Sequence, residues 1–280
     1  MSNILFIVEG SKDEPKYIDQ FIQYHKEVME QNGNNVSPII VQSYGTLIYD
    51  LYKRISSYPE EDEFETIPVL LDILKSKSLK YSSDLENYDN FSDIFLFFDL
   101  DAHYYWKRRD RNDVLYNDMR DLLSFFNEST EKGKLLISYP MFEALKCFND
   151  DFINDSNVLC HLFDIYEVKE KGSKTTFKKK YKCISSDSYK SPDYSKEKIE
   201  KLVQYFIFCS FYLVENTTDI SNSDIIFKNQ FEKFIKPNEQ IVILSSFPHF
   251  IVDIFGIQNC GYNMKRKVII KDISEYPKIF

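Results

Sequence analysis

Residues 94–101 are IFLFFDLD, an apolar run over Ile94–Phe98 that ends in the acidic pair Asp99 and Asp101. A continuous apolar run of this length predicts a strand buried on both faces, as in a parallel sheet. Residues i and i+2 of an extended segment point to the same side, so we expect both carboxylates to share one face. The segment predicts an α/β fold with acidic groups at the carboxyl end of a strand, where such folds place their chemistry.

The rest of the first half alternates between short apolar runs and amphipathic segments. Further strands are predicted at Ile4–Val8, Pro38–Val41 and Leu135–Ile137, and helices at Lys16–Met29, Leu47–Ile55 and Asp113–Phe126. This alternation predicts right-handed crossovers and a parallel sheet flanked by helices. An insertion over about residues 57–92, with a helix near Ile67–Leu74, interrupts the pattern.

The second half is predicted to be a mostly helical accessory region. We place the boundary near residue 150, which gives domains over residues 1–150 and 151–280. Within the second region we expect helices at Lys196–Val214 and Phe247–Phe255, strands at Gln240–Leu244 and Lys267–Ile270, and a lysine-rich loop over Lys169–Lys190.

Composition limits the class of protein. The 280 residues carry 35 basic and 44 acidic side chains, a formal net charge of −9 that argues against coating nucleic acid by net charge. The glycine-rich patterns GxGxxG and GxxxxGK[ST] do not occur, so the chain has no ATPase phosphate loop of its own. Unpaired cysteines and short apolar runs predict a reduced, cytoplasmic protein without a membrane span.

Acidic residues follow three of the predicted strands. Glu9 follows the first, Asp99 and Asp101 follow the third, and Glu143 lies just after the fourth. Neighbouring carboxylates repel unless a cation lies between them, and a few hard oxygen donors suit Mg²⁺. Taken singly, Glu9-Gly10 is also compatible with a plain turn, and the aspartate pair with a solvated loop or a helix cap. Their joint placement at strand ends favours a metal site.

These motifs resemble the toprim domain of topoisomerases, primases and OLD-type nucleases. The matching segments are FIVEG at Phe6–Gly10 and FFDLD at Phe97–Asp101. EGSKDEP at Glu9–Pro15 and YPMFEA at Tyr139–Ala144 extend the resemblance to RloB-like nucleases and to the toprim subunit of PARIS-type anti-phage defence pairs. The resemblance covers residues 1 to about 150.

The resemblance implies a role for each acidic residue. Glu9, Asp99 and Asp101 would bind Mg²⁺ or Mn²⁺, and Glu9 would also serve as general acid or base. Glu14 would support these ligands or hold a second metal; the alternative is an exposed helix-start charge favoured by the dipole. Glu143 would complete the site; the alternative is a buried ion pair. The chain departs from many relatives in having AHYYW after Asp101, which leaves the second metal open.

The implied function is a metal-dependent endonuclease that hydrolyses phosphodiester bonds of DNA or RNA, with tRNA among the candidate substrates. It would be the toxic effector of a bacterial anti-phage defence system. A separate ATPase would hold or activate it, and the aromatic-rich helix at Lys196–Val214 is the place to look for a docking or homodimer surface. The alternative is a catalytically degenerate toprim module that acts as a nucleic-acid or protein-binding subunit.

Two basic segments are candidate nucleic-acid contacts. The first follows Asp101 closely and joins cations to an aromatic ring that can stack on unpaired bases: Trp106, Lys107, Arg108, Arg109 and Arg111. The second is the lysine run Lys178, Lys179 and Lys180. For the lysine run a solvated loop is an equal alternative.

Overall fold

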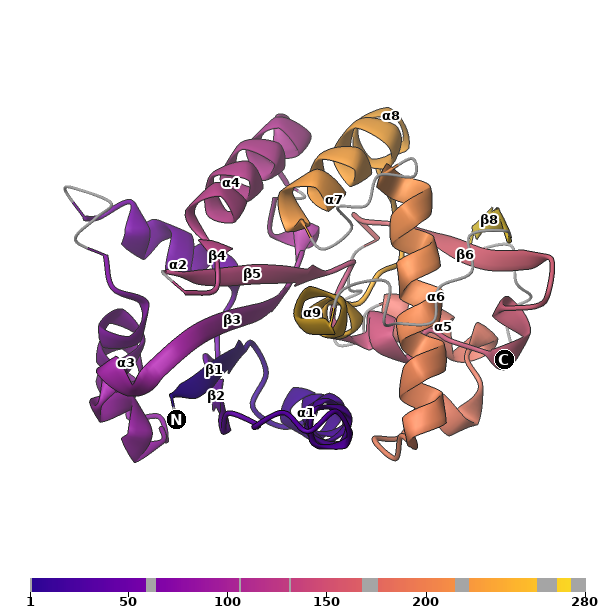
Figure 1. The fold of residues 1–280 in the computed structure, drawn as a ribbon. Helices are drawn as coiled ribbons and strands as arrows, with labels where there is room; N and C mark the ends of the chain where they lie inside the picture. Colours follow the sequence, from indigo (N-terminus) through magenta and orange to yellow (C-terminus); the bar gives the residue numbers. More distant parts are fainter. Residues whose placement is uncertain are drawn as a thin grey trace. The chain divides into compact units, whose positions relative to one another are not determined.

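The computed structural model describes residues 2–58, 64–105, 107–130, 132–167, 176–214, 222–255 and 266–272 (Figure 1). The chain forms two compact units that interleave along the sequence. The first unit comprises Met1–Phe98 and Asp121–Leu136, and the second comprises Asp99–Arg120 and Ile137–Phe280. The boundary predicted near residue 150 is therefore not one of the junctions between these units.

A five-stranded sheet is the centre of the first unit. Its strands are β1 (Asn3–Val8), β2 (Ile39–Ser43), β3 (Phe91–Asp99), β4 (Asn127–Glu128) and β5 (Gly133–Ser138), in the order β2-β1-β3-β5-β4. β1 is parallel to both β2 and β3, as the sequence predicted, whereas β4 is antiparallel to β5. Successive residues of β1 point to opposite faces, and Ile4–Val8 is buried throughout, so helices or loops cover both faces here.

The helices of the first half lie close to their predicted positions. They are α1 (Glu14–Gln31), α2 (Ile48–Ile55), α3 (Thr66–Ser76) and α4 (Arg111–Phe125). Pro15 lies in the first turn of α1, where its missing N–H leaves no hydrogen bond unmade. The predicted insertion contains α3 and two short 3₁₀ turns, η2 (Ser83–Glu86) and η3 (Tyr88–Asn90). These elements make the residues around 57–92 an ordered part of the first unit where the structure describes them.

The second unit combines helices with a second, three-stranded sheet. Its central strand β6 (Asn157–Asp164) is antiparallel to β7 (Gln240–Val242) and parallel to β8 (Lys267–Asp272). The helices are α5 (Thr176–Ile184), α6 (Lys196–Val214), α7 (Ser223–Gln230), α8 (Lys236–Asn238) and α9 (Ser246–Phe255), with a π turn, η8 (Phe231–Ile235), between α7 and α8. No helix in the described part of the chain is long and apolar enough to cross a bilayer.

Two elements of this unit correct the sequence-based expectations. The loop predicted over Lys169–Lys190 is wrong for Thr176–Ile184, which forms α5. Phe177, Tyr181 and Ile184 are all buried and recur at helical spacing, a pattern that the intervening lysines hide. β6 was not predicted at all, and its presence means that the second half is less purely helical than expected.

His161, at the centre of β6, is a buried titratable residue. The side chain is completely buried, and its Nδ1 lies 3.4 Å from the Tyr205 hydroxyl. Burial, with a smaller contribution from Lys271, lowers the pKa of His161 to about 4. The pKa of a histidine in an unfolded chain is about 6.5. At a pH between the folded and unfolded pKa values, the unfolded chain therefore binds a proton at His161 that the folded chain does not.

We therefore expect the free energy of unfolding to decrease as the pH falls from about 6.5 towards about 4, by roughly 3 kcal/mol in total from this residue. His161→Gln should remove this part of the pH dependence, although it lowers stability at neutral pH. Urea unfolding of wild type and variant at pH 7 and pH 4.5 measures the difference. Parallel losses in the two proteins would contradict the assignment.

Candidate functional site

The turn at Glu9-Gly10 is held from several directions within the first unit. The end of β2 and the residues after it hold this turn: Ser43 Oγ donates to the Gly10 carbonyl at 3.0 Å, and the Gly45 N–H donates to the Glu9 carbonyl at 3.0 Å. The Tyr44 N–H donates to the Val8 carbonyl at 2.8 Å. Glu9 itself is half-buried. The backbone that carries Glu9 is thus fixed before any ligand binds.

Glu14, the first residue of α1, completes this turn. Its Oε2 accepts a hydrogen bond from the Gly10 N–H at 3.0 Å. A Cβ atom on residue 10 would lie 2.8 Å from Glu14 Oε1, so a larger residue there would displace the carboxylate from this position. Glu14 also lies in the first helical turn, where the dipole favours a negative charge. The structure thus shows Glu14 supporting the turn that bears Glu9.

Asp99 and Asp101 lie in the second unit and have different backbone geometries. Asp99 ends β3, and its Oδ1 accepts a hydrogen bond of 2.6 Å from the Phe142 N–H. Asp101 lies past the strand with a φ of 45°, in the left-handed region. The prediction that both aspartates belong to one extended segment is therefore wrong, because the strand ends before Asp101.

The Asp101 side chain is buried although it bears a carboxylate. Residue 101 is only 7% exposed, and its Oδ1 lies 3.3 Å from His103 Nδ1. Between the two aspartates, the Leu100 N–H donates to the Ser138 carbonyl at 3.0 Å. A non-glycine residue with positive φ and a buried charge is costly on both counts, and such strained residues cluster at functional sites.

Glu143 lies one residue after the Phe142 N–H that binds Asp99. It belongs to the 3₁₀ turn η5 (Phe142–Lys146), is 9% exposed and forms an ion pair with Lys178 of α5, with Oε1 and Nζ 2.6 Å apart. Glu143 thus has the ion-pair partner that the alternative expected, but the pair is not buried, because the Lys178 side chain is 42% exposed. α5 brings one lysine of the predicted basic run next to the acidic motif after β5.

Lys146 was missed as a site residue. It is 7% exposed, and its ammonium lies 4.8 Å from the centre of the Phe142 ring. The available signal was a lysine in the mostly apolar segment FEALKCF, where flanking apolar residues favour burial. It adds a second cation to the turn that holds Asp99.

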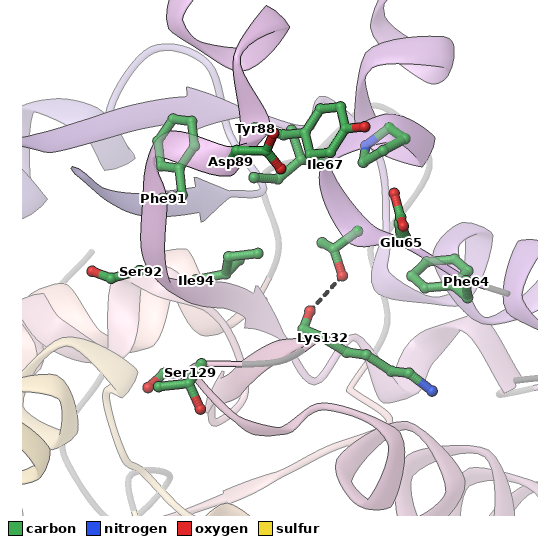
Figure 2. A pocket seen from close by; sticks show the side chains of 13 residues that line it. Phe64, Glu65, Ile67, Tyr88, Asp89, Phe91, Ser92, Ile94, Ser129 and Lys132 are labelled. Carbon is green, nitrogen blue, oxygen red and sulfur yellow. Dashed lines mark hydrogen bonds between the residues drawn. The ribbon is translucent and has the colours of Figure 1, made fainter. Parts of the chain in front are cut away.

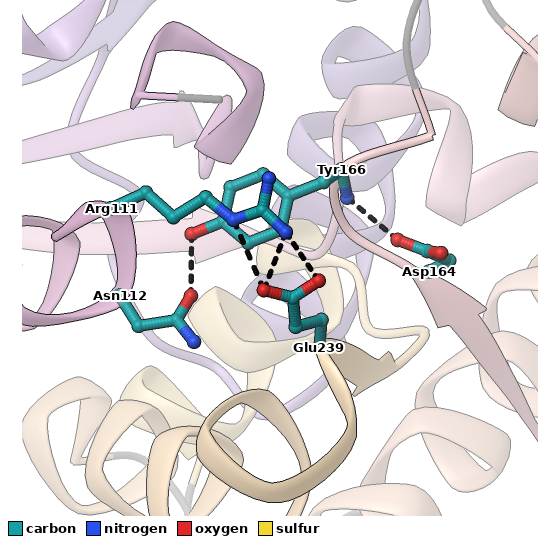
Figure 3. Close-up of polar contacts among 5 residues, drawn as sticks. All are labelled: Arg111, Asn112, Asp164, Tyr166 and Glu239. Carbon is teal, nitrogen blue, oxygen red and sulfur yellow. Dashed lines mark hydrogen bonds and ion pairs between the residues drawn. The ribbon is translucent and has the colours of Figure 1, made fainter. Parts of the chain in front are cut away.

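Arg111, a predicted nucleic-acid contact, is engaged inside the second unit (Figure 3). Its guanidinium forms hydrogen bonds of 3.0 and 2.6 Å with Glu239 Oε1 and stacks 4.1 Å from the centre of the Tyr166 ring. The Tyr166 hydroxyl donates to Asn112 Oδ1 at 2.8 Å, and its N–H donates to Asp164 Oδ1 at 2.9 Å. Arg111 thereby links the start of α4 to the segments after β6 and before β7.

Among the other predicted basic contacts, some side chains form ion pairs with carboxylates and others are exposed to solvent. Arg108 pairs with Asp110 at 2.9 Å, and Lys180 pairs with Glu167 at 2.8 Å. Lys107, Arg109 and Lys179 are exposed to solvent. Trp106 lies outside the described residues. The exposed cations are the ones best suited to meet a phosphate backbone.

Within the described residues, no three His, Cys, Asp or Glu side chains lie together as a ready-made metal-ligand group. Asp99 and Asp101 are two carboxylates with hard oxygen donors, a donor type that suits Mg²⁺ or Mn²⁺. Such ions keep several waters and need few protein ligands. No family model, curated protein or solved structure matches the chain.

Proposed function

We propose that the chain is a metal-dependent endonuclease that hydrolyses phosphodiester bonds of DNA or RNA, built on a toprim-like domain. The observation that carries this proposal is Asp101: a buried carboxylate with a left-handed backbone, directly after the central strand β3. Keeping a charge buried and a backbone strained costs stability, so a role in binding or chemistry is the better explanation.

The strand register supports Glu9 as a partner of this motif. In the parallel pairing of β1 and β3, Val8 lies opposite Phe97; Glu9 is the residue after Val8, and Asp99 is the last residue of β3. Open α/β sheets bind ligands at these carboxyl ends. Glu9, Asp99 and Asp101 would hold Mg²⁺ or Mn²⁺, which when bound stabilises the charge on a phosphodiester under attack and activates water.

The surrounding residues have positioning roles in this proposal. The Phe142 N–H orients the Asp99 carboxylate, and Glu14 holds the turn that carries Glu9. The exposed Lys107, Arg109 and Lys179 would bind substrate phosphates. We further propose that the protein is the toxic effector of a bacterial anti-phage defence system, with a separate ATPase partner.

The second candidate function is a degenerate toprim module that binds nucleic acid or protein without cutting. The observation that favours it is the ion pair between Glu143 and Lys178, which occupies one of the predicted site carboxylates with a cation of the protein itself. This alternative predicts nucleic-acid binding that does not depend on a divalent cation, and no heat of metal binding by calorimetry.

A cleavage assay distinguishes the two. The full chain would be incubated with plasmid, phage DNA and total tRNA in Mg²⁺, Mn²⁺ or EDTA, with and without an ATPase encoded beside it. The nuclease proposal expects new ends in Mg²⁺ or Mn²⁺ and none in EDTA, together with toxicity on expression in bacteria. Intact nucleic acid in every combination, with binding retained, would establish the binding module instead.

A further inference from the structure

We infer that the first unit carries a separate binding site for an organic cation, a guanidinium or alkylammonium group on a short apolar stem. The site is a pocket of about 340 Å³ at the amino end of β3, whereas Asp99 is at the carboxyl end of that strand (Figure 2). This volume is within the usual range for small-ligand pockets. The inference does not depend on nuclease activity.

The pocket has walls that are fixed by hydrogen bonds within the unit. Thr66 Oγ1, at the start of α3, donates to the Lys132 carbonyl. Across the pocket, Ser129 Oγ donates to Asp93 Oδ1 at 2.8 Å, and the Ile94 N–H donates to the Ser129 carbonyl at 2.8 Å. These bonds join α3, β3 and the turn between β4 and β5, so the cavity is preformed.

The charge lining the pocket is predominantly negative. Glu65 and Asp89 both line it, and no hydrogen bond or ion pair to another described residue engages either carboxylate. Lys132 lines it too, but its ammonium lies over the Phe125 ring, 4.3 Å from the centre. An anionic ligand would be repelled here. A neutral apolar ligand would remove water from the carboxylates without replacing their hydrogen bonds.

Aromatic and apolar side chains complete the recognition surface. Tyr88 is 47% exposed, and Phe91 and Ile67 also line the cavity. Figure 2 shows Tyr88, Asp89 and Glu65 around one side of the pocket, across from Ser129 and Lys132. Aromatic faces attract cations, and apolar walls favour the stem that carries the charge. Carboxylates and rings around one cavity therefore select an organic cation.

Calorimetric titration of the full chain tests this site. The probe is N-acetyl-arginine amide, and N-acetyl-citrulline amide is the neutral control of nearly the same shape. We expect the arginine probe to bind and the citrulline probe not to bind. Glu65→Gln or Asp89→Asn should each weaken binding about twofold to fivefold, as expected for losing a partly exposed charge pair. Asp72→Asn, an exposed change on α3, should leave binding unchanged.

The same titration identifies the source of the cation. A short peptide with one central arginine that binds more tightly than the capped amino acid would indicate a basic side chain of a protein partner. Equal affinities would indicate a free small molecule. Equal binding of arginine and citrulline probes, no binding of any cation, or equal effects of Asp72→Asn and Glu65→Gln would each overturn the inference. Nucleic acid is absent from the titration, so its outcome is independent of cleavage.

Discussion

Replacing Asp99 by asparagine is expected to lower nucleic-acid cleavage by at least about a hundredfold while the protein stays folded. Asparagine keeps a carbonyl oxygen that can accept the hydrogen bond from the Phe142 N–H, which is 2.6 Å from Asp99 Oδ1 in the wild type. It removes the negative charge that a divalent cation requires. This variant thus removes the charge that metal binding needs while it keeps the hydrogen bond that supports the fold.

Asp99→Ala is expected to lose cleavage activity and also part of the stability of the fold. It removes the charge and leaves the Phe142 N–H without its acceptor, which should lower the free energy of unfolding by about 1–3 kcal/mol. Cleavage rates with Mn²⁺ and urea unfolding of both variants measure the two effects. Asp110→Asn is a suitable control because Asp110 is exposed and pairs with Arg108 at the surface. Wild-type cleavage by a folded Asp99→Asn protein would refute the proposed site.

Much of the fold could be predicted because the spacing of apolar residues along the chain indicates its strands and helices. The apolar run at Ile94–Phe98 forms the buried centre of β3, and the helix predicted at Lys196–Val214 is α6. Both signals arise from burial of residues that are close together in the sequence.

What could not be predicted depends on residues that are far apart in the sequence. The pairs Arg111–Glu239 and Lys178–Glu143 are each formed by helices and turns whose packing no spacing rule describes. They show that Arg111 and Lys178, one cation from each predicted basic segment, have carboxylate partners within the protein. The left-handed backbone of Asp101 could not be predicted either, because aspartate adopts that conformation far less often than glycine.

The largest loss of stability from a single methyl group is expected at Gly133, the first residue of β5. Its φ is 112°, which L side chains rarely adopt, and a Cβ atom there would lie 2.6 Å from Leu96 Cδ1 and 3.0 Å from Ile94 Cγ2. Both neighbours are buried in β3 and cannot move away freely. Gly133→Ala should therefore lower the free energy of unfolding by about 3–4 kcal/mol, from backbone strain and overpacking together.

Gly33→Ala is the comparison. Gly33 also has a positive φ, 72°, but apart from its two chain neighbours no described residue has an atom within 4 Å of the position that an alanine methyl group would take, so only strain of about 1–2 kcal/mol applies. Urea unfolding of the two variants measures the difference, which combines the larger backbone strain at a φ of 112° with the cost of pushing a methyl group against β3. Because β3 leads directly to Asp99, Gly133→Ala should also reduce cleavage, whereas Gly33→Ala should not. Equal losses of stability would show that close packing of β5 on β3 is not what requires glycine.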